Sequence, residues 1–570
     1  MDKQFFDQKS HTFLIGTLIL LGYVFCMFGN GMVSLTHPDE VFYIQSAKEM
    51  VEYNKWFTPM IFDGVQFEKP FVAFTLFAAA IKWFGLNSGA ARFWPALFGM
   101  IGIVVAYWIS WTLFARKRLA FLSGMILCTS FIYVALSRAV LTDMIFTNIL
   151  AIAIGFFLLA YYNPKYKTAG LIWAWVFTAI GVLTKGALGL SFFTTTVWLF
   201  LWYRKDFKFL LCPANYIGIG LFLLIATPWH VIMYQHHGQW FIDEYWTNVH
   251  VRRLFEAEHK RLDNWYFYPG LIFGGIMPWS FFWFPAASAA FDQFKQKIKG
   301  REKIFFLLGW MAAVLLYTQP AVSKLASYIF PLFPAVAILV AWYIDQAIEK
   351  ADRGEKQTGL KMCAYSMATV MIVGGIVGPI IAHQYLDIIV SAVPAYVAAC
   401  FLFVTAGSII VFNRQAKYGR MILSYIGMTT TLLILLLAAR PYIEPWVSCK
   451  DISDVFKKID QSDTPVLASK FYVRGVRYYT DRPMAVIDIN GKGFWSPHPI
   501  PFLNTDQMVV DFFNERPVTY AVVKEGNVKD IFRILKGRPF TIEELDGIGG
   551  KFILRVTKIQ NFAKLAPTLP

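Results

Sequence analysis

The sequence predicts a polytopic α-helical membrane protein followed by a small mixed α/β domain, with about 13 transmembrane helices in the first part. Composition is the first reason: of the 570 residues, 57% are apolar and only 16% are charged, whereas a soluble chain carries roughly a quarter of charged residues. The second reason is pattern. Apolar runs long enough to cross a bilayer recur from residue 12 to residue 439, and the texture changes after residue 450.

The expected spans are long apolar segments separated by polar loops. They cover residues 12–30, 90–114, 119–137, 143–162, 168–184, 187–203, 209–229, 266–289, 304–319, 328–346, 362–382, 388–412 and 421–439. The first apolar stretch, Phe13–Phe28, lacks a small-residue cleavage site and precedes further spans, so we expect a membrane helix and not a removed signal peptide. The shorter run Phe71–Phe84 follows Pro70 and is expected to lie along the membrane surface.

The net charge of +16 does not indicate nucleic-acid binding, because the basic residues are spread over short loops between apolar runs. These loops are 116–118, 165–167, 204–205, 295–303, 350–361 and 414–420. Placing them in the cytoplasm, as the positive-inside rule requires, puts the N-terminus inside and the chain after residue 440 outside. The sequence thus predicts a membrane domain 1–440, with an outer-face loop 31–89, and an extracytoplasmic domain 441–570.

The last part of the chain alternates short apolar runs with helix-like segments, which is typical of a mixed α/β domain. The expected strands are Pro465–Ser469, Met484–Ile489, Tyr520–Val523 and Phe552–Val556, and the expected helices are Gln507–Asn514 and Val528–Leu535. We expect this domain to be a cap over the membrane part. The six cysteines show neither a disulfide framework nor zinc-type spacing.

Polar residues that need an explanation gather in the loops expected at the outer face. They are Asp39 and Glu40 after the first span, Arg138 and Asp143, Lys185, the histidines and acids of 230–265, and Lys324 with Tyr328. A transport path would instead place charges near the bilayer midplane, on broken helices of repeated halves. Convergence at one face therefore favours a site at the outer interface.

Each residue also has an ordinary structural interpretation. Asp39 and Glu40 could be the N-cap and first-turn acid of a surface helix Val41–Tyr53. Lys185 could reach to the interface from a helix end. Asp143 could pair with Arg138 for structure alone, and His236 and His237 could be exposed loop histidines.

The order of the motifs adds to the individual residues. The chain carries Pro38-Asp39-Glu40-Val41-Phe42-Tyr43, Phe67-Glu68-Lys69-Pro70, Arg138 to Asp143, Leu183-Thr184-Lys185-Gly186, Asn248-Val249-His250-Val251-Arg252-Arg253, Pro278-Trp279, and Ser323-Lys324-Leu325 with Tyr328, Pro331 and Pro334. This series resembles membrane glycosyltransferases of the GT-C type that use polyprenyl-phosphate sugars. It is most similar to the 4-amino-4-deoxy-L-arabinose transferase branch, which is related to the protein O-mannosyltransferases.

The resemblance implies roles for individual residues. Asp39, with Glu40 beside it, would be the catalytic acid pair, and Asp143 belongs to a second acidic motif. Glu68 and His250 would be ligands of a divalent metal such as Zn, Mg or Mn, and no nucleotide or redox cofactor is expected. The donor phosphate would be held by Lys69, Lys185, Arg253, Tyr328, Tyr43 and Lys324. The family commonly carries a basic residue at the position of Phe42, which puts phosphate or acceptor recognition by this loop in doubt.

The implied reaction is inverting transfer of a sugar from undecaprenyl or another polyprenyl phosphate to an envelope glycolipid such as lipid A. It would take place at the outer face of a bacterial inner membrane. Two alternatives stay open at this point. One is transfer to Ser or Thr of secreted proteins, and the other is transport of a lipid-linked sugar.

Overall fold

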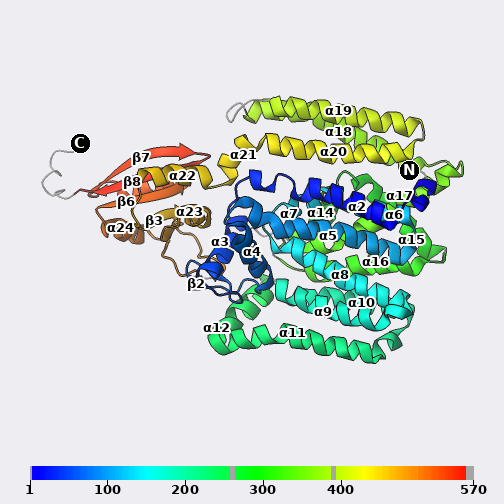
Figure 1. Ribbon diagram of the computed structural model, residues 1–570. Coiled ribbons are helices and arrows are strands. Elements are labelled where there is room, and N and C mark those ends of the chain that lie inside the picture. Colours follow the sequence, from blue (N-terminus) through cyan, green and yellow to red (C-terminus); the bar gives the residue numbers. More distant parts are fainter. Residues whose placement is uncertain are drawn as a thin grey trace. The chain divides into compact units, whose positions relative to one another are not determined.

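The computed structural model describes residues 3–252, 255–256, 264–322, 324–386, 393–496 and 498–559 (Figure 1). The chain divides into two compact units. The first contains Met1–Asn30, Phe67–Leu76 and Arg92–Ala438, and the second contains Gly31–Gln66, Phe77–Ala91 and Ala439–Pro570. The loop that follows the first helices thus belongs to the same unit as the C-terminal part of the chain.

The first unit is a bundle of helices. Its α-helices are α1 (Lys3–Gln8), α2 (His11–Gly22), α5 (Ser88–Phe114), α6 (Lys117–Thr129), α7 (Phe131–Ser137), α8 (Thr142–Tyr162), α9 (Lys167–Lys185), α10 (Leu188–Arg204), α11 (Pro213–His237), α12 (Gln239–Phe241), α14 (Phe267–Gly275), α15 (Trp283–Lys295), α16 (Arg301–Thr318), α17 (Phe333–Asp352), α18 (Thr358–Leu386), α19 (Val393–Arg414) and α20 (Tyr418–Ala438). A π-helix, Ile242–Arg252, and a 3₁₀ helix, Ala326–Leu332, lie between them.

The predicted membrane character is confirmed. Within the described ranges, nine helices are long and apolar enough to cross a bilayer, and eleven if two bent helix pairs each count as one span. The bent pairs are α6 with α7, at 64°, and α14 with the segment Ser280–Lys295, at 120°. The other two expected spans coincide with α10 and α16, helices of 17 and 18 residues. The expected total of about 13 crossings stays a prediction.

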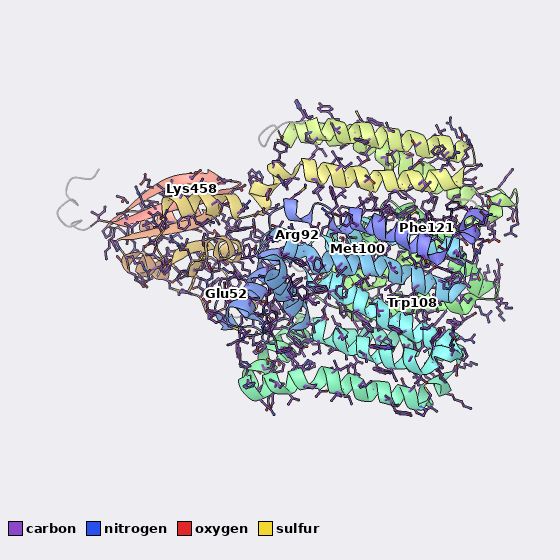
Figure 2. All side chains as sticks on the ribbon, in the orientation of Figure 1. Glu52, Arg92, Met100, Trp108, Phe121 and Lys458 are labelled. Atoms are coloured by element: carbon purple, nitrogen blue, oxygen red, sulfur yellow. The ribbon has the colours of Figure 1, made fainter. Side chains whose placement is uncertain are left out.

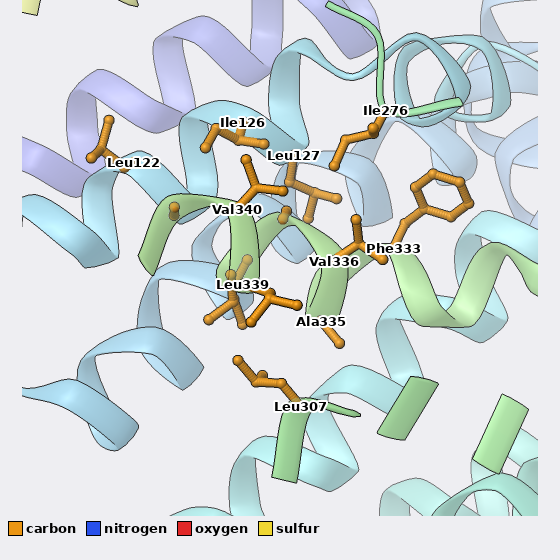
Figure 3. Close-up of a cluster of buried hydrophobic side chains, with 14 of the residues drawn as sticks. Leu122, Ile126, Leu127, Ile276, Leu307, Phe333, Ala335, Val336, Leu339 and Val340 are labelled. Atoms are coloured by element: carbon orange, nitrogen blue, oxygen red, sulfur yellow. The ribbon is translucent and has the colours of Figure 1, made fainter. Parts of the chain in front are cut away.

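Helix α17 lies at the centre of the bundle. Phe333, Ala335, Val336, Leu339 and Val340 are all fully buried, and they pack against residues of α6 and α16 (Figure 3). A helix that is apolar on every side is one that other helices surround. α17 therefore fixes the positions of its neighbours.

Helix α5 packs closely on α8 because one contact is made by a glycine. Arg92, Met100 and Trp108 follow one another along α5 (Figure 2). A Cβ atom at Gly155 of α8 would lie 2.4 Å from Cζ3 of Trp108. Small residues at helix contacts let backbones approach, which is how helices in a bilayer gain packing contacts.

The second unit is built on a six-stranded sheet, which confirms the expected α/β domain. Its strands are β3 (Val466–Ser469), β4 (Met484–Ile487), β5 (Phe502–Leu503), β6 (Val518–Lys524), β7 (Phe540–Ile548) and β8 (Lys551–Lys558), in the order β5-β4-β3-β6-β8-β7. Its helices are α3 (Asp39–Glu52), α21 (Arg440–Val447), α22 (Lys450–Ile459), α23 (Val473–Thr480), α24 (Asp506–Asn514) and α25 (Glu525–Leu535). A short hairpin, β1 (Met60–Ile61) with β2 (Gly64–Val65), precedes α4 (Val72–Phe84), where the chain passes between the units.

The sheet combines two kinds of pairing. β5, β4, β3 and β6 are parallel, and β8 and β7 are antiparallel additions. Every residue of β3 and β4 is buried, as expected for parallel strands that are covered on both faces. The runs predicted as strands lie in β3, β4, β6 and β8, and the predicted helices lie in α24 and α25, so these elements are confirmed.

Candidate functional site

A buried ion pair stands at one end of the first unit. α8 begins at Thr142 and α9 ends at Lys185, and the two helices pack side by side. Nζ of Lys185 donates to Oδ1 of Asp143, and both side chains are buried. A carboxylate in the first turn and an ammonium in the last turn each sit favourably in the dipole of their own helix. The antiparallel pair thus places a lysine and its counter-ion where the two helix ends meet.

Aromatic rings complete the surroundings of Lys185. Its Nζ lies 5.4 Å from the ring centroid of Phe146 and 5.6 Å from that of Tyr328. Tyr328 belongs to the 3₁₀ helix before α17. Lys324, four residues earlier, is also buried, and its Nζ donates to the carbonyl of Ala321 over 3.0 Å.

His250 is held against the same helix end. Its Nδ1 lies 2.6 Å from the carbonyl oxygen of Tyr245, and because a carbonyl oxygen only accepts, Nδ1 donates this hydrogen bond. A Cβ atom at Gly186, the residue after Lys185, would lie 2.4 Å from Nε2 of His250. Gly186 has φ +87°, a conformation that glycine adopts without strain. His250 therefore lies beside the residue that follows Lys185.

Two aromatic side chains fix the segment that carries Glu68 and Lys69. Phe67 is buried, and its ring centroid lies 5.0 Å from that of Trp240 and 5.1 Å from that of Phe241. The ring of Phe71 lies 5.9 Å from that of Trp229 in α11. Glu68 and Lys69 are half-buried between these two anchors.

The structure brings together some of the residues that the sequence singled out. Asp143, Lys185, Tyr328 and His250 lie close to one another, whereas Arg253 lies outside the described residues. Two of the ordinary structural roles considered from the sequence, those of Asp143 and Lys185, are wrong. Asp143 pairs with Lys185 and not with Arg138, and Lys185 is buried instead of reaching to the interface. Arg138 donates to the carbonyls of Phe25 and Phe28, over 3.1 and 2.8 Å.

In the second unit, α3 begins at Asp39. Asp39 is exposed in its first turn and Tyr43 is half-buried one turn later. Glu40 is buried, and its Oε2 accepts from both the backbone N–H and the hydroxyl of Thr36, each over 2.9 Å. Glu40 thus fixes the chain as it enters the helix, as a first-turn acid, whereas the expected N-cap role of Asp39 is wrong because Pro38 holds that position.

The segment before Asp39 takes its hydrogen bonds from the C-terminal part of the chain. The N–H of Ser34 donates to Oε1 of Glu444 (2.6 Å), and the N–H of His37 donates to the carbonyl of Val447 (3.0 Å). The hydroxyl of Tyr479 accepts from the N–H of Leu35 (3.0 Å) and donates to its carbonyl (3.3 Å). We call Glu444, Val447 and Tyr479 the clamp, because these residues hold the backbone that leads to Asp39.

His37 is enclosed by aromatic rings and by Cys449. Its ring lies edge-on to Phe471 (4.9 Å) and Tyr472 (5.0 Å), and its Nδ1 lies 3.6 Å from Sγ of Cys449. Burial, with the nearby charge of Lys551, lowers the pKa of His37 to about 4. Burial also raises the pKa of Cys449 to about 12. Both side chains are therefore neutral at pH 7.

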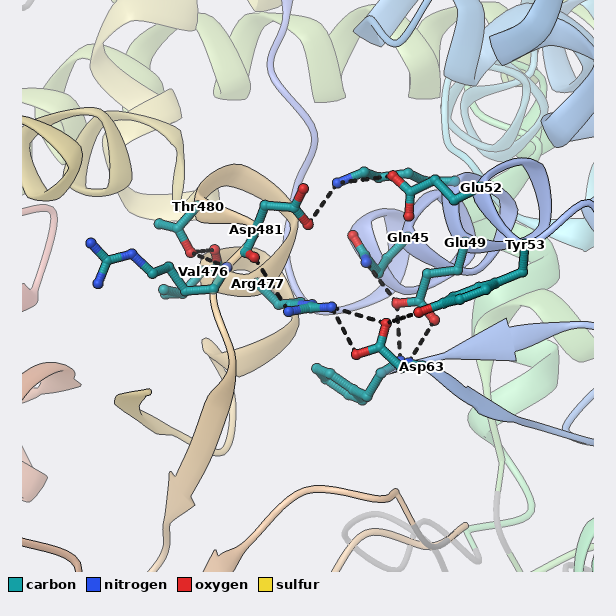
Figure 4. A network of polar contacts seen from close by, with 12 residues as sticks. Gln45, Glu49, Glu52, Tyr53, Asp63, Val476, Arg477, Thr480 and Asp481 are labelled. Carbon is teal, nitrogen blue, oxygen red and sulfur yellow. Dashed lines mark hydrogen bonds and ion pairs between the residues drawn. The ribbon is translucent and has the colours of Figure 1, made fainter. Parts of the chain in front are cut away.

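The β1–β2 hairpin adds a second attachment (Figure 4). Its two turn residues, Phe62 and Asp63, have positive φ values of 52° and 65°, which is costly for residues with side chains. Glu49 of α3 accepts from both turn amides, over 3.0 and 2.9 Å, and Asp63 pairs with Arg477 of α23 at 3.0 Å. Burial raises the pKa of Glu49.

Sequence patterns did not identify Glu444, Tyr479 or Arg477 as functional residues. Their partners lie more than 400 residues earlier in the chain, with separations of 410, 444 and 414 residues. No periodic pattern or local motif reports contacts of this kind. Only a co-variation signal could have found them.

Gly186→Ala tests the contact with His250. The added Cβ would meet Nε2, and overpacking of this kind costs about 1–3 kcal/mol beyond the roughly 1 kcal/mol that a positive φ costs an alanine. Gly238→Ala is the matched control, because Gly238 also has a positive φ, +56°, but no neighbour within 4 Å of its Cβ position. Thermal unfolding in detergent should show the larger loss for Gly186→Ala. Equal losses would refute the contact.

Tyr479→Phe tests the clamp. Without the hydroxyl, the buried N–H and carbonyl of Leu35 lose their partner, at a cost of about 1–3 kcal/mol. Local opening should then speed alkylation of the Cys449 thiol by roughly tenfold or more, measured at that residue by mass spectrometry. Tyr216→Phe, which removes a hydroxyl from an exposed position on α11, should leave the rate unchanged. An unchanged rate in Tyr479→Phe would mean that the clamp does not hold this segment.

Known proteins share both sequence and fold with the chain. Residues 15–239 match the family described as dolichyl-phosphate-mannose-protein mannosyltransferase. The undecaprenyl phosphate-alpha-4-amino-4-deoxy-L-arabinose arabinosyl transferase of Edwardsiella ictaluri is 27% identical over 355 residues, 61% of this chain and 62% of that protein. An uncharacterized protein of Aquifex aeolicus is 29% identical over 336 residues, 58% of this chain and 64% of that protein. The matches thus span about three fifths of these relatives' length.

The fold agrees with these sequence matches. The crystal structure of ArnT from Cupriavidus metallidurans bound to undecaprenyl phosphate superposes with a TM-score of 0.76 at 17% identity, over 96% of this chain and 98% of that chain. At this identity the likeness shows the fold alone. The chain is thus similar to this transferase in fold, and over residues 15–239 it is similar in sequence to the mannosyltransferase family.

Proposed function

We propose that the protein is an inverting glycosyltransferase that moves a sugar from undecaprenyl phosphate to an envelope glycolipid of the lipid A type. The observation that carries the proposal is the helix end where Lys185 lies beside Tyr328, Gly186 and His250. A buried cation with aromatic neighbours suits a departing phosphate. The names of the relatives support the donor and the sugar class, since one is an arabinosyl transferase and one neighbour was solved with undecaprenyl phosphate.

In the proposed reaction, a hydroxyl oxygen of the acceptor attacks the anomeric carbon of the sugar. The bond from that carbon to the phosphate oxygen breaks, and undecaprenyl phosphate leaves with the electron pair. Asp39 takes the hydroxyl proton, a role that contributes about 10²–10⁴-fold to the rate. Lys185 and Lys69, with Tyr43, Lys324 and Tyr328, stabilise the charge that develops on the phosphate.

We further propose that this end of the bundle and the second unit face the periplasm, with the N-terminus in the cytoplasm of a bacterial inner membrane. The distribution of basic loops supports this orientation. The match to protein mannosyltransferases favours one alternative acceptor, a Ser or Thr hydroxyl of a secreted protein. Both acceptors present the same nucleophile, so the site chemistry is common to them.

Lipid A from a deletion strain, complemented with wild type, Asp39→Asn or Asp454→Asn, tests this function by mass spectrometry. Asp454 is the control, because it is a half-exposed acid on α22 that pairs with Lys457. Wild type and Asp454→Asn should restore a sugar-sized mass that the deletion strain lacks. The transfer rate of Asp39→Asn should be at least about 100-fold lower than that of wild type, as expected for removal of a general base.

Two results would contradict parts of this proposal. Full restoration by Asp39→Asn would exclude the assigned base. Unchanged lipid A, together with a sugar lost from secreted proteins, would exclude the acceptor and favour the protein acceptor instead.

We also propose that Glu68 and His250 hold a divalent metal ion near the donor phosphate. The hydrogen bond between Nδ1 of His250 and the carbonyl of Tyr245 supports this role, because metal-binding histidines commonly donate their other ring N–H to a backbone carbonyl. Among the described residues, no group of three or more His, Cys, Asp and Glu side chains could hold a metal, so water or the phosphate would complete the coordination. A bound Zn²⁺ would add positive charge at the leaving group.

Metal content of the purified protein tests this proposal without an activity assay. Wild type should retain zinc through gel filtration, and His250→Ala and Glu68→Ala should lose it. His236→Ala is the control, because His236 is exposed at the end of α11. Equal metal content in all four proteins would refute the site.

A further inference from the structure

Arg474 of α23 is held between two aromatic rings in the second unit. Its Cζ lies 4.6 Å from the ring centroid of Phe42 and 5.5 Å from that of Phe494. One of its terminal nitrogens, Nη2, lies 3.1 Å from Nε2 of His498. Guanidinium groups stack favourably on aromatic faces, and stacking fixes the plane in which the N–H donors point.

Arg474 differs in its ion pairing from other arginines of the second unit. Among the residues that the structure describes, no carboxylate forms an ion pair with it, and its Nε is buried without a hydrogen-bond partner. Other arginines of the same unit pair with acids, namely Arg440, Arg477, Arg482, Arg516, Arg533 and Arg555. A partly buried cation without a partner is unfavourable, so this one is suited to an anion from outside the chain.

The guanidinium contacts Phe42, which stands one helical turn after Asp39 on α3. Phe42 follows Asp39 by three positions in α3, and residues with this spacing are neighbours on a helix surface, with Cβ atoms about 5–6 Å apart. The preceding residues of the Arg474 segment run along the same loop, because Phe471 and Tyr472 contact His37. Lys470 lies 5.7 Å from the ring of Phe494, but its charge is paired with Asp488 at 3.7 Å.

We propose that Arg474 binds a phosphate group of the lipid acceptor and so places the acceptor hydroxyl beside Asp39. A stacked guanidinium presents its N–H groups as a planar fork, which matches two oxygens of a phosphate. This inference rests on the proposed transferase function and assigns its acceptor-binding residue. The same chemistry could serve the phosphate of the donor lipid, and the experiment separates the two sources.

Steady-state kinetics of the purified full chain compare bisphosphorylated lipid A with the same lipid after removal of its phosphates. The variants are Arg474→Gln, Arg474→Lys and the control Arg516→Gln. Arg516 also stacks on a ring, that of Phe512 at 5.8 Å, but it pairs with Glu515. A second assay measures undecaprenyl phosphate binding to each protein by tryptophan fluorescence.

Arg474→Gln should raise KM for the phosphorylated acceptor about tenfold or more, the loss expected for one charged hydrogen bond, with kcat within about twofold. KM for the dephosphorylated lipid should not change, and Arg516→Gln should match wild type. For the phosphorylated acceptor, KM of Arg474→Lys should lie between the values of wild type and Arg474→Gln, because lysine keeps the charge but not the planar fork. If Arg474→Gln folds poorly, Arg474→Lys is used instead. Its KM for the phosphorylated lipid is then compared with its KM for the dephosphorylated lipid in the same way.

A loss of undecaprenyl phosphate binding, with an unchanged acceptor KM, would support the phosphate site and assign it to the donor. Wild-type values for Arg474→Gln in both assays would overturn the proposal and leave Arg474 a packing residue. A third assay measures how tightly each protein binds vesicles that contain phosphorylated or dephosphorylated lipid A, and this measurement does not require sugar transfer. It therefore tests Arg474 even if wild type transfers no sugar and the proposed function fails.

Discussion

The backbone of residues 34–37 imposes the main constraint on the second unit. This segment lies outside helices and strands, so its N–H and carbonyl groups need partners from other parts of the chain. Ser34 and Leu35 are buried, and water therefore cannot supply those partners at little cost. Glu444, Val447 and Tyr479 supply them instead. The α/β domain consequently determines the path of the chain that leads to Asp39.

A related constraint acts in the first unit, where charges are buried at helix ends. A single buried ion costs several kcal/mol, so Lys185 and Asp143 are tolerable only as a pair and only at the termini whose dipoles they complement. At the other end of the bundle, the buried charges of Arg118 and Asp345 also form a pair, over 2.5 Å. Between these ends the core around α17 is apolar. Chemistry that needs charge is thereby confined to the ends of the helices.

Periodicity and motif order predicted those features that depend on local sequence. The strands at Val466–Ser469 and Met484–Ile487 are short apolar runs, and the helix Asp506–Asn514 is amphipathic. Three site residues could be proposed from the sequence because the motifs that contain them follow the order seen in the family that the chain resembles. They are Asp39, Lys185 and His250. The pairing of Asp143 was not predictable, since Arg138 is nearer in sequence and only the packing of α8 on α9 selects Lys185. The clamp was also missed, because its contacts bridge more than 400 residues.

Phe42 shows how a loop can change one residue without losing the charge near it. The resemblance leads one to expect a basic side chain at this position, and the sequence alone leaves phosphate recognition there in doubt. The structure places the guanidinium of Arg474 on the Phe42 ring. Because residues 31–66 and the C-terminal domain fold as one unit, a cation can come from either segment. The aromatic ring of Phe42 in α3 then becomes the surface on which an arginine from a distant part of the sequence is held.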